Sequence, residues 1–204
     1  MAGLMATACN SFLDLEPMSA LSPEQYLTTE DNLASYANDL YAIFPGHGEN
    51  EWGRWSDDNN TDNMAYMAPS DIFAPGYWRV AQTGGSYSFS EIYRCNYFLD
   101  FVLPLYDAGE ITGIDANIRH YIGEVYFFRA WSYFSKLKAL GDFPIVKEPL
   151  DDNLEVLTEA SKRAPRNEVA RFILEDLDMA ISYMSEVPPI GGANRLDKDC
   201  ARLF

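Results

Sequence analysis

Residues 118–146 read IRHYIGEVYFFRAWSYFSKLKALGDFPIV, and this stretch decides the fold class. Its apolar side chains cover most of a helix circumference instead of one narrow stripe: Tyr121, Ile122, Val125, Tyr126, Phe127, Phe128, Trp131, Phe134, Leu137 and Leu140. A helix that is apolar on nearly all sides is buried among other helices. Gly141 predicts a left-handed residue at the end of this helix, and Pro144 prevents its continuation. The stretch therefore predicts a central helix inside an all-helical domain.

Three other stretches have the apolar spacing of amphipathic helices, and they would cover the central one. The first follows Thr28 and Asp31, which together predict a helix start, and it ends at Pro45. The second runs from residue 92 to 102 and is predicted to end before Pro104. The third runs from residue 169 to 184. Two segments between these stretches lack helical spacing. Residues 46–86 have no periodicity and are predicted to form a long irregular loop. Residues 151–164 are polar and acidic and are predicted to cross the surface of the protein.

Composition and charge limit the class of ligand. With 204 residues, of which 48% are hydrophobic, the chain can build one domain with a substantial core. The formal net charge of -16 argues against nucleic acid, because phosphate binding depends on clustered Lys and Arg side chains. A neutral ligand fits this charge better. Aromatic residues make up 14% of the chain, which leaves some of them available for a binding surface.

The three cysteines have no metal-binding spacing. We expect Cys95 and Cys200 to be buried thiols on helices, with a disulfide as the less favoured alternative. Cys9 follows small and apolar residues that are typical of the end of a signal peptide, although Ala6 stands where a lipobox has Leu. Cys9 is therefore either a lipid attachment site or an ordinary cysteine in an N-terminal tail.

Several motifs occur in an order that resembles the SusD/RagB-like family of outer-membrane nutrient-binding lipoproteins. They are Cys9 to Pro17, Ser22 to Tyr26, Thr29-Glu30-Asp31, Glu124, Arg129-Ala130, Gly141-Asp142-Phe143-Pro144, Pro165 to Ala180, and Asn194 to Lys198. The spacing of Ala130, Phe134 and Pro144 is also similar to the end of a tetratricopeptide unit. The resemblance implies a tetratricopeptide-like array of antiparallel helices that carries a long irregular loop. It also implies a lipoprotein tail over residues 1–21, a helical domain over residues 22–204 that is incomplete at its C-terminus, and a lipid anchor on Cys9.

The function that the resemblance implies is capture of oligosaccharides at the cell surface and their delivery to a TonB-dependent transporter in the outer membrane. Sugar rings present apolar faces and a rim of hydroxyls, so a binding site needs flat aromatic side chains beside short carboxylates and amides. Residues 46–86 contain both kinds of side chain. In the family, the turn at Thr61-Asp62-Asn63 would precede aromatic residues that line the glycan site. The candidate ligand-binding residues are Tyr66, Trp78, Tyr77, Trp52, Trp55, Asp62 and Asn63. The alternative is that these tryptophans anchor the loop onto the helices.

Other kinds of site are less favoured. The spacing of Asp58, Asn60 and Asp62 is similar to a calcium loop, but the expected Gly and Glu are absent, so we expect no metal. His47 and His120 accompany no nucleophile or metalloprotease motif. Arg129 is expected to form a structural ion pair among aromatic rings instead of a ligand clamp. We therefore expect neither enzyme activity nor a cofactor. A helical scaffold that binds a protein and, less favoured, an all-helical glycoside hydrolase are the alternatives; the sequence leaves open which glycan is bound and whether the cargo is peptide.

Overall fold

The computed structural model describes residues 26–44, 75, 87–189 and 194–204. Over these residues the chain folds into helices and forms no strands, only two isolated bridges, Thr29 with Thr112 and Phe143 with Ala164. The elements are α2 (Glu30–Leu40), the 3-10 turn η2 (Tyr41–Ile43), α3 (Ser90–Ala108), α4 (Asp115–Leu140), α5 (Leu154–Ala160), α6 (Arg166–Tyr183) and α7 (Lys198–Leu203). The all-helical prediction is confirmed. Within the described ranges, no helix combines the length and apolarity needed to cross a membrane.

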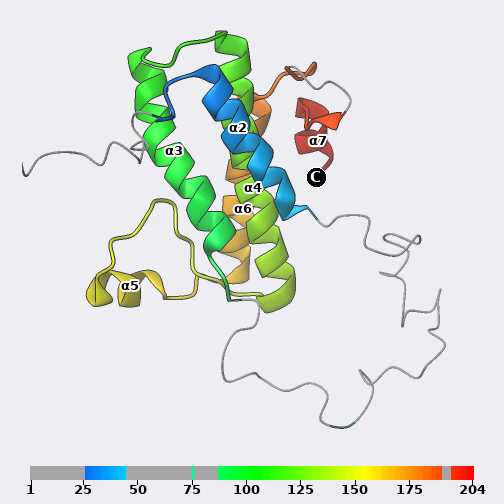
Figure 1. Ribbon diagram of the computed structural model, residues 1–204. Helices are drawn as coiled ribbons and strands as arrows, with labels where there is room; N and C mark the ends of the chain where they lie inside the picture. Colours follow the sequence, from blue (N-terminus) through cyan, green and yellow to red (C-terminus); the bar gives the residue numbers. More distant parts are fainter. Residues whose placement is uncertain (1–25, 45–74, 76–86, 190–193) are drawn as a thin grey trace, which may run out of the picture.

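Helix α4 is the centre of the fold, and α2, α3 and α6 all pack against it (Figure 1). Every residue of α4 from His120 to Ala130 is buried, which explains why the sequence shows no polar face there. Phe89 at the start of α3 stacks on Phe143, just after the end of α4, whereas Tyr106 near the end of α3 bonds Asp115 at the start of α4. Helices α3 and α4, which follow one another in the chain, therefore run antiparallel, as the family resemblance predicts.

Gly123 lets the end of α6 approach α4 closely. A Cβ atom at this position would lie 2.5 Å from Cγ of Met184 and 2.9 Å from its backbone nitrogen. Real side chains do not tolerate such distances, so any larger residue would push the two helices apart. The glycine in the middle of the central helix is thus explained by packing.

Two helix boundaries differ from the sequence prediction. Helix α2 is capped by Thr29 and not by Thr28, since the Thr29 hydroxyl accepts the N–H of Asn32 at 3.4 Å. Helix α3 continues through Pro104 to Ala108 and ends at Gly109, whose φ is 70°. Asp100 and Pro104 are both exposed, so water can hydrate the carbonyl group that the proline leaves without a donor. The proline therefore does not end the helix.

The corner after α4 contains the Gly-Asp-Phe-Pro motif. Gly141 has a φ of 75° and a ψ of -105°, so the prediction of a left-handed residue at the helix end is right in the sign of φ but not in ψ. The Asp142 carboxylate accepts the N–H of Arg166 at 2.8 Å and so satisfies the first turn of α6. Phe143 is fully buried and exchanges two backbone hydrogen bonds with Ala164. The motif therefore turns the chain and sets where α6 begins.

Residues 151–164, predicted as a polar crossing, contain the short helix α5. The Asn153 side chain accepts the N–H groups of Glu155 and Val156 at 2.9 and 3.4 Å, and this cap starts the helix. None of the α5 residues is buried. Figure 1 shows α5 projecting to the side of the other helices.

Both described cysteines are free thiols, as predicted. Cys95 on α3 is fully buried, whereas Cys200 on α7 is half-buried, so the expectation of burial is wrong in part for Cys200. Burial raises the pKa of the Cys95 thiol to about 12, which keeps it protonated at neutral pH.

We therefore expect iodoacetamide to alkylate Cys200 in the native protein at neutral pH and to reach Cys95 only after denaturation. Peptide mapping by mass spectrometry measures both sites, and a Cys9→Ser background removes the third thiol. Equal alkylation of Cys95 and Cys200 in the native state would contradict this expectation.

Candidate functional site

The predicted ligand-binding residues Trp52, Trp55, Asp62, Asn63, Tyr66, Tyr77 and Trp78 lie outside the described residues, as do Cys9 and His47. The structure shows how the two flanks of this part of the chain are held. On one flank, Phe44 packs edge-on against Trp131 with the ring centroids 5.1 Å apart. On the other flank, Tyr87 packs against Phe143 with a centroid distance of 5.2 Å. Phe44 and Tyr87, which flank this part of the chain, therefore lie against the second half of α4 and the segment just after it.

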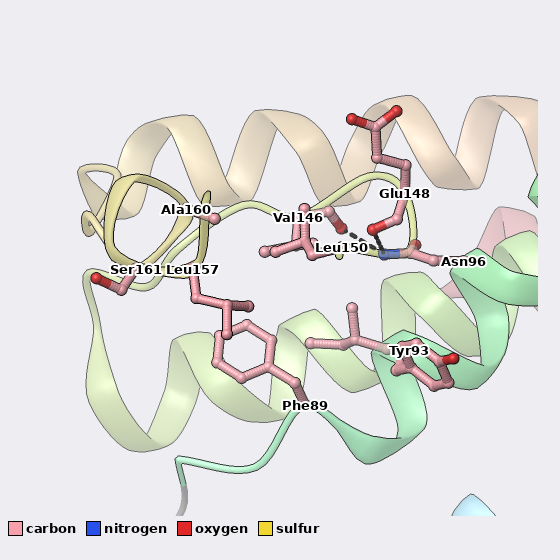
Figure 2. Close-up of a pocket in the computed structure, with 10 residues that line it drawn as sticks. Phe89, Tyr93, Asn96, Val146, Glu148, Leu150, Leu157, Ala160 and Ser161 are labelled. Carbon is pink, nitrogen blue, oxygen red and sulfur yellow. Dashed lines mark hydrogen bonds between the residues drawn. The ribbon is translucent and has the colours of Figure 1, made fainter. Parts of the chain in front are cut away.

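The same end of the fold contains a cavity of about 250 Å³ (Figure 2). Its lining comes from three stretches: Phe89, Ile92, Tyr93 and Asn96 at the start of α3, Val146, Glu148 and Leu150 in the segment after α4, and Leu157, Ala160 and Ser161 at the end of α5. Tyr93 and Leu157 are partly exposed, so the cavity opens to solvent. No single motif predicts this site, because its walls come from three separate stretches.

Buried hydrogen bonds fix the inner wall of the cavity. The Asn96 amide donates to the carbonyl of Val146 at 2.8 Å. The Tyr133 hydroxyl donates to the same carbonyl at 3.0 Å and accepts the Val146 N–H at 2.8 Å. These bonds hold the segment after α4 against α3 and α4. They also use the polar atoms of the inner wall within the protein, which leaves the cavity an apolar lining.

Arg129 connects this wall to α6. Its guanidinium donates two bonds to the Asp176 carboxylate, at 2.7 and 2.8 Å, and a third to the Asn96 side-chain oxygen at 2.9 Å. It also lies over the rings of Tyr126 and Phe172, at 5.4 and 5.2 Å from their centroids. The prediction that Arg129 forms a structural ion pair among aromatic rings is confirmed.

Burial affects the two members of this pair differently. Burial raises the pKa of Asp176 more than the Arg129 guanidinium lowers it. Burial lowers the pKa of Arg129, but the hydrogen bonds and charge of Asp176 outweigh that effect and raise it. With the two side chains only 7% and 3% exposed, the pair is largely removed from water, and each charge depends on its partner.

A second buried network surrounds Glu124 on α4. Its carboxylate accepts the Tyr41 hydroxyl at 2.6 Å and the Arg195 guanidinium at 2.6 Å. His120 is fully buried: its Nδ1 accepts the N–H of Ser185 at 3.1 Å, and its Nε2 lies 3.1 Å from the carbonyl of Leu196. Because both ring nitrogens already have partners inside the protein, His120 is placed for structure and not for proton transfer to a substrate.

Neither network contains the elements of a metal site. Within the described part of the chain, no group of three or more His, Cys, Asp or Glu side chains is arranged to hold a metal ion. Among the described residues, the geometry therefore offers an open apolar cavity near the end of α4 and two buried polar networks that hold the helices.

Comparison with known proteins gives a consistent match. A family model of SusD-like proteins, described as starch-binding and associating with the outer membrane, matches residues 11–190. SusD-like protein P25 of Formosa agariphila is 24% identical over 216 aligned residues, which cover 96% of this chain and 39% of that protein. SusD-like protein P38 of the same organism is 25% identical over 192 residues, covering 88% of this chain and 35% of that protein. The chain thus spans 39% and 35% of the length of these two relatives.

Solved structures show the same fold. A SusD-like carbohydrate-binding protein from Bacteroides fragilis matches 86% of this chain and 36% of its own length, with a TM-score of 0.56 and 17% identity. A further SusD-like protein from this organism matches 88% of this chain and 34% of its own length, with a TM-score of 0.52 and 18% identity. At such identities the likeness concerns the arrangement of helices.

Proposed function

The chain belongs to the SusD-like family, and from this premise we propose that it binds glycans at the cell surface and delivers them to a TonB-dependent outer-membrane transporter. The observation that carries the proposal is the family match over residues 11–190, in a family described as starch-binding. The fold is consistent with it, since buried networks make α3, α4 and α6 a rigid support for a binding surface.

Within this proposal, Tyr66 and Trp78 supply the flat aromatic surfaces for sugar rings. Trp52, Trp55 and Tyr77 add to them, and Asp62 and Asn63 bond hydroxyl groups. Support comes from the composition of residues 46–86 and from the packing of Phe44 and Tyr87 against the second half of α4 and the segment after it. Binding needs only stacking and hydrogen bonds, so we propose no enzymatic step. Cys9 would carry the lipid that holds the protein at the outer membrane, and stable anchoring needs more than one acyl chain.

We expect Trp78→Ala or Tyr66→Ala to weaken oligosaccharide binding about tenfold or more, because each change removes a large apolar contact from the ligand. Isothermal titration calorimetry with a panel of neutral oligosaccharides measures the change in affinity. The experiment uses the full-length protein. Tyr106→Ala is the matched control, since Tyr106 lies near the end of α3, at the start of α4 and away from the flanks.

The outcomes distinguish site from function. If both variants fold and bind sugars as the unchanged protein does, the proposed residues are wrong while glycan binding stands. If the unchanged protein binds peptides but no oligosaccharide, the proposal of glycan binding is wrong, and a role in binding peptides or proteins is favoured.

A further inference from the structure

Helix α5 presents apolar side chains to solvent beside the cavity. Leu154 is 83% exposed, and Val156 and Leu157 are each 40% exposed. Tyr93 on the opposite side of the cavity mouth is 50% exposed. We call these four residues together with the cavity the α5 surface. It combines a cavity that can accept a side chain, lined in part by Tyr93 and Leu157, with further exposed apolar side chains on α5, and exposed apolar groups gathered in this way mark interaction sites.

Acidic side chains surround this surface. Residues 148–160 contain five carboxylates and no Lys or Arg: Glu148, Asp151, Asp152, Glu155 and Glu159. All five residues are exposed. Of the cations beside this stretch, Lys147 lies 3.7 Å from Glu175, Lys162 bonds Glu159 at 2.6 Å, and Arg163 lies over the Tyr87 ring, 5.1 Å from its centroid. Among the described residues, four of the five carboxylates therefore have no cation paired with them. The field around the cavity mouth is therefore negative and attracts a basic partner.

The chemistry of the cavity limits what can fill it. A sugar needs free donors and acceptors inside the cavity, but the Asn96 side chain already donates to Val146 and accepts from Arg129, and Figure 2 shows the Glu148 carboxylate turned away from the cavity. A second copy of this chain would bring two acidic rims together, which is unfavourable. An aliphatic or aromatic side chain meets neither obstacle, because the lining is apolar.

We propose that the α5 surface docks a segment of a partner protein that inserts one aliphatic or aromatic side chain into the cavity and places Lys or Arg side chains beside it. The apolar insertion supplies affinity at the centre, and the acidic rim supplies steering and orientation. This interaction does not depend on glycan binding, and it uses residues outside the proposed sugar site.

A random peptide library displayed on phage tests the proposal. Phages that bind the Leu157→Asp variant are removed first, and the remaining library is then selected for binding to the unchanged protein. We expect the enriched peptides to share one large apolar residue flanked by Lys or Arg. Fluorescence anisotropy of synthetic copies should show affinity at least about tenfold weaker for Leu157→Asp and for Tyr93→Ala, which removes the opposite wall.

Leu174→Asp is the matched control, because Leu174 is 61% exposed on α6 and does not line the cavity, so affinity should not change. Circular dichroism checks that each variant is folded. The proposal is overturned if no enriched peptide depends on Leu157, or if the shared motif lacks basic residues. It is also overturned if Leu157-dependent self-association appears in sedimentation, or if oligosaccharides bind in the cavity.

Discussion

Replacing Arg129 by Met should lower the free energy of unfolding by about 3–5 kcal/mol, the range for breaking a buried ion pair. Met retains much of the apolar stem but removes every donor. The carboxylate of Asp176 and the side-chain oxygen of Asn96 then lose their partner inside the core. Urea denaturation followed by circular dichroism measures the change. A loss below about 1 kcal/mol would mean that water reaches Asp176 and that the pair is not desolvated.

The double variant Arg129→Met with Asp176→Leu provides the control. Because burial already raises the pKa of Asp176, its ionised form costs stability at neutral pH, and this cost grows as the pH rises through that pKa. Removing both charges should therefore recover most of the lost stability, since an apolar pair in this position leaves no unpaired charge. If the double variant is no more stable than Arg129→Met, the lost donor to Asn96 is the larger part of the effect.

The sequence predicts the central helix and the structural role of Arg129, because both follow from local pattern. An arginine within a run of aromatic residues must be neutralised if the helix is buried. The partner, however, lies 47 residues further along, and the chain has 31 acidic residues to choose from. Only packing of α6 against α4 selects Asp176. Patterns along the chain thus predict that a pair exists but not which carboxylate completes it.

The prediction of helix boundaries from sequence is wrong at positions exposed to solvent. Pro104 would end a buried helix, but it lies on an exposed face of α3, where the carbonyl of Asp100 is accessible to water, and the helix continues. Residues 154–160 lack a buried face, so periodicity gives no signal for α5, and the Asn153 cap starts a helix that the pattern does not reveal. Both differences arise from surface positions, where hydrophobic spacing carries little information.

The cavity at the end of α4 could not be predicted from the sequence. Phe89, Val146 and Leu157 each have an ordinary local explanation as an apolar side chain on or beside a helix. Their convergence depends on the Gly141 turn and on the hydrogen bonds that hold Val146 against Tyr133. The residues proposed to bind sugar, by contrast, rest on composition and on the family, and they stay a prediction until binding is measured.

Glu124 is the second position at which one substitution should have a large effect. We expect Glu124→Ala to lower the free energy of unfolding by about 3–5 kcal/mol, because the Arg195 guanidinium, whose side chain is only 8% exposed, loses its charged partner. The Tyr41 hydroxyl also loses its acceptor, while still accepting the N–H of Leu196 at 2.9 Å. The change therefore weakens the attachment of residues 195–196, which lead into α7, in addition to creating an unpaired charge.

The exposed carboxylate Glu175 is the matched control for Glu124, since it lies 3.7 Å from Lys147 with both side chains more than half exposed. Its replacement by Ala should cost less than about 1 kcal/mol, the range of a solvent-screened pair. Urea denaturation compares the two variants, and hydrogen exchange of residues 195–203 reports the attachment of α7. Faster exchange there in Glu124→Ala, without change in α6, would show that Glu124 acts mainly as the link between α4 and α7. Equal losses for the two carboxylates would contradict this assignment, because burial is the property that separates them.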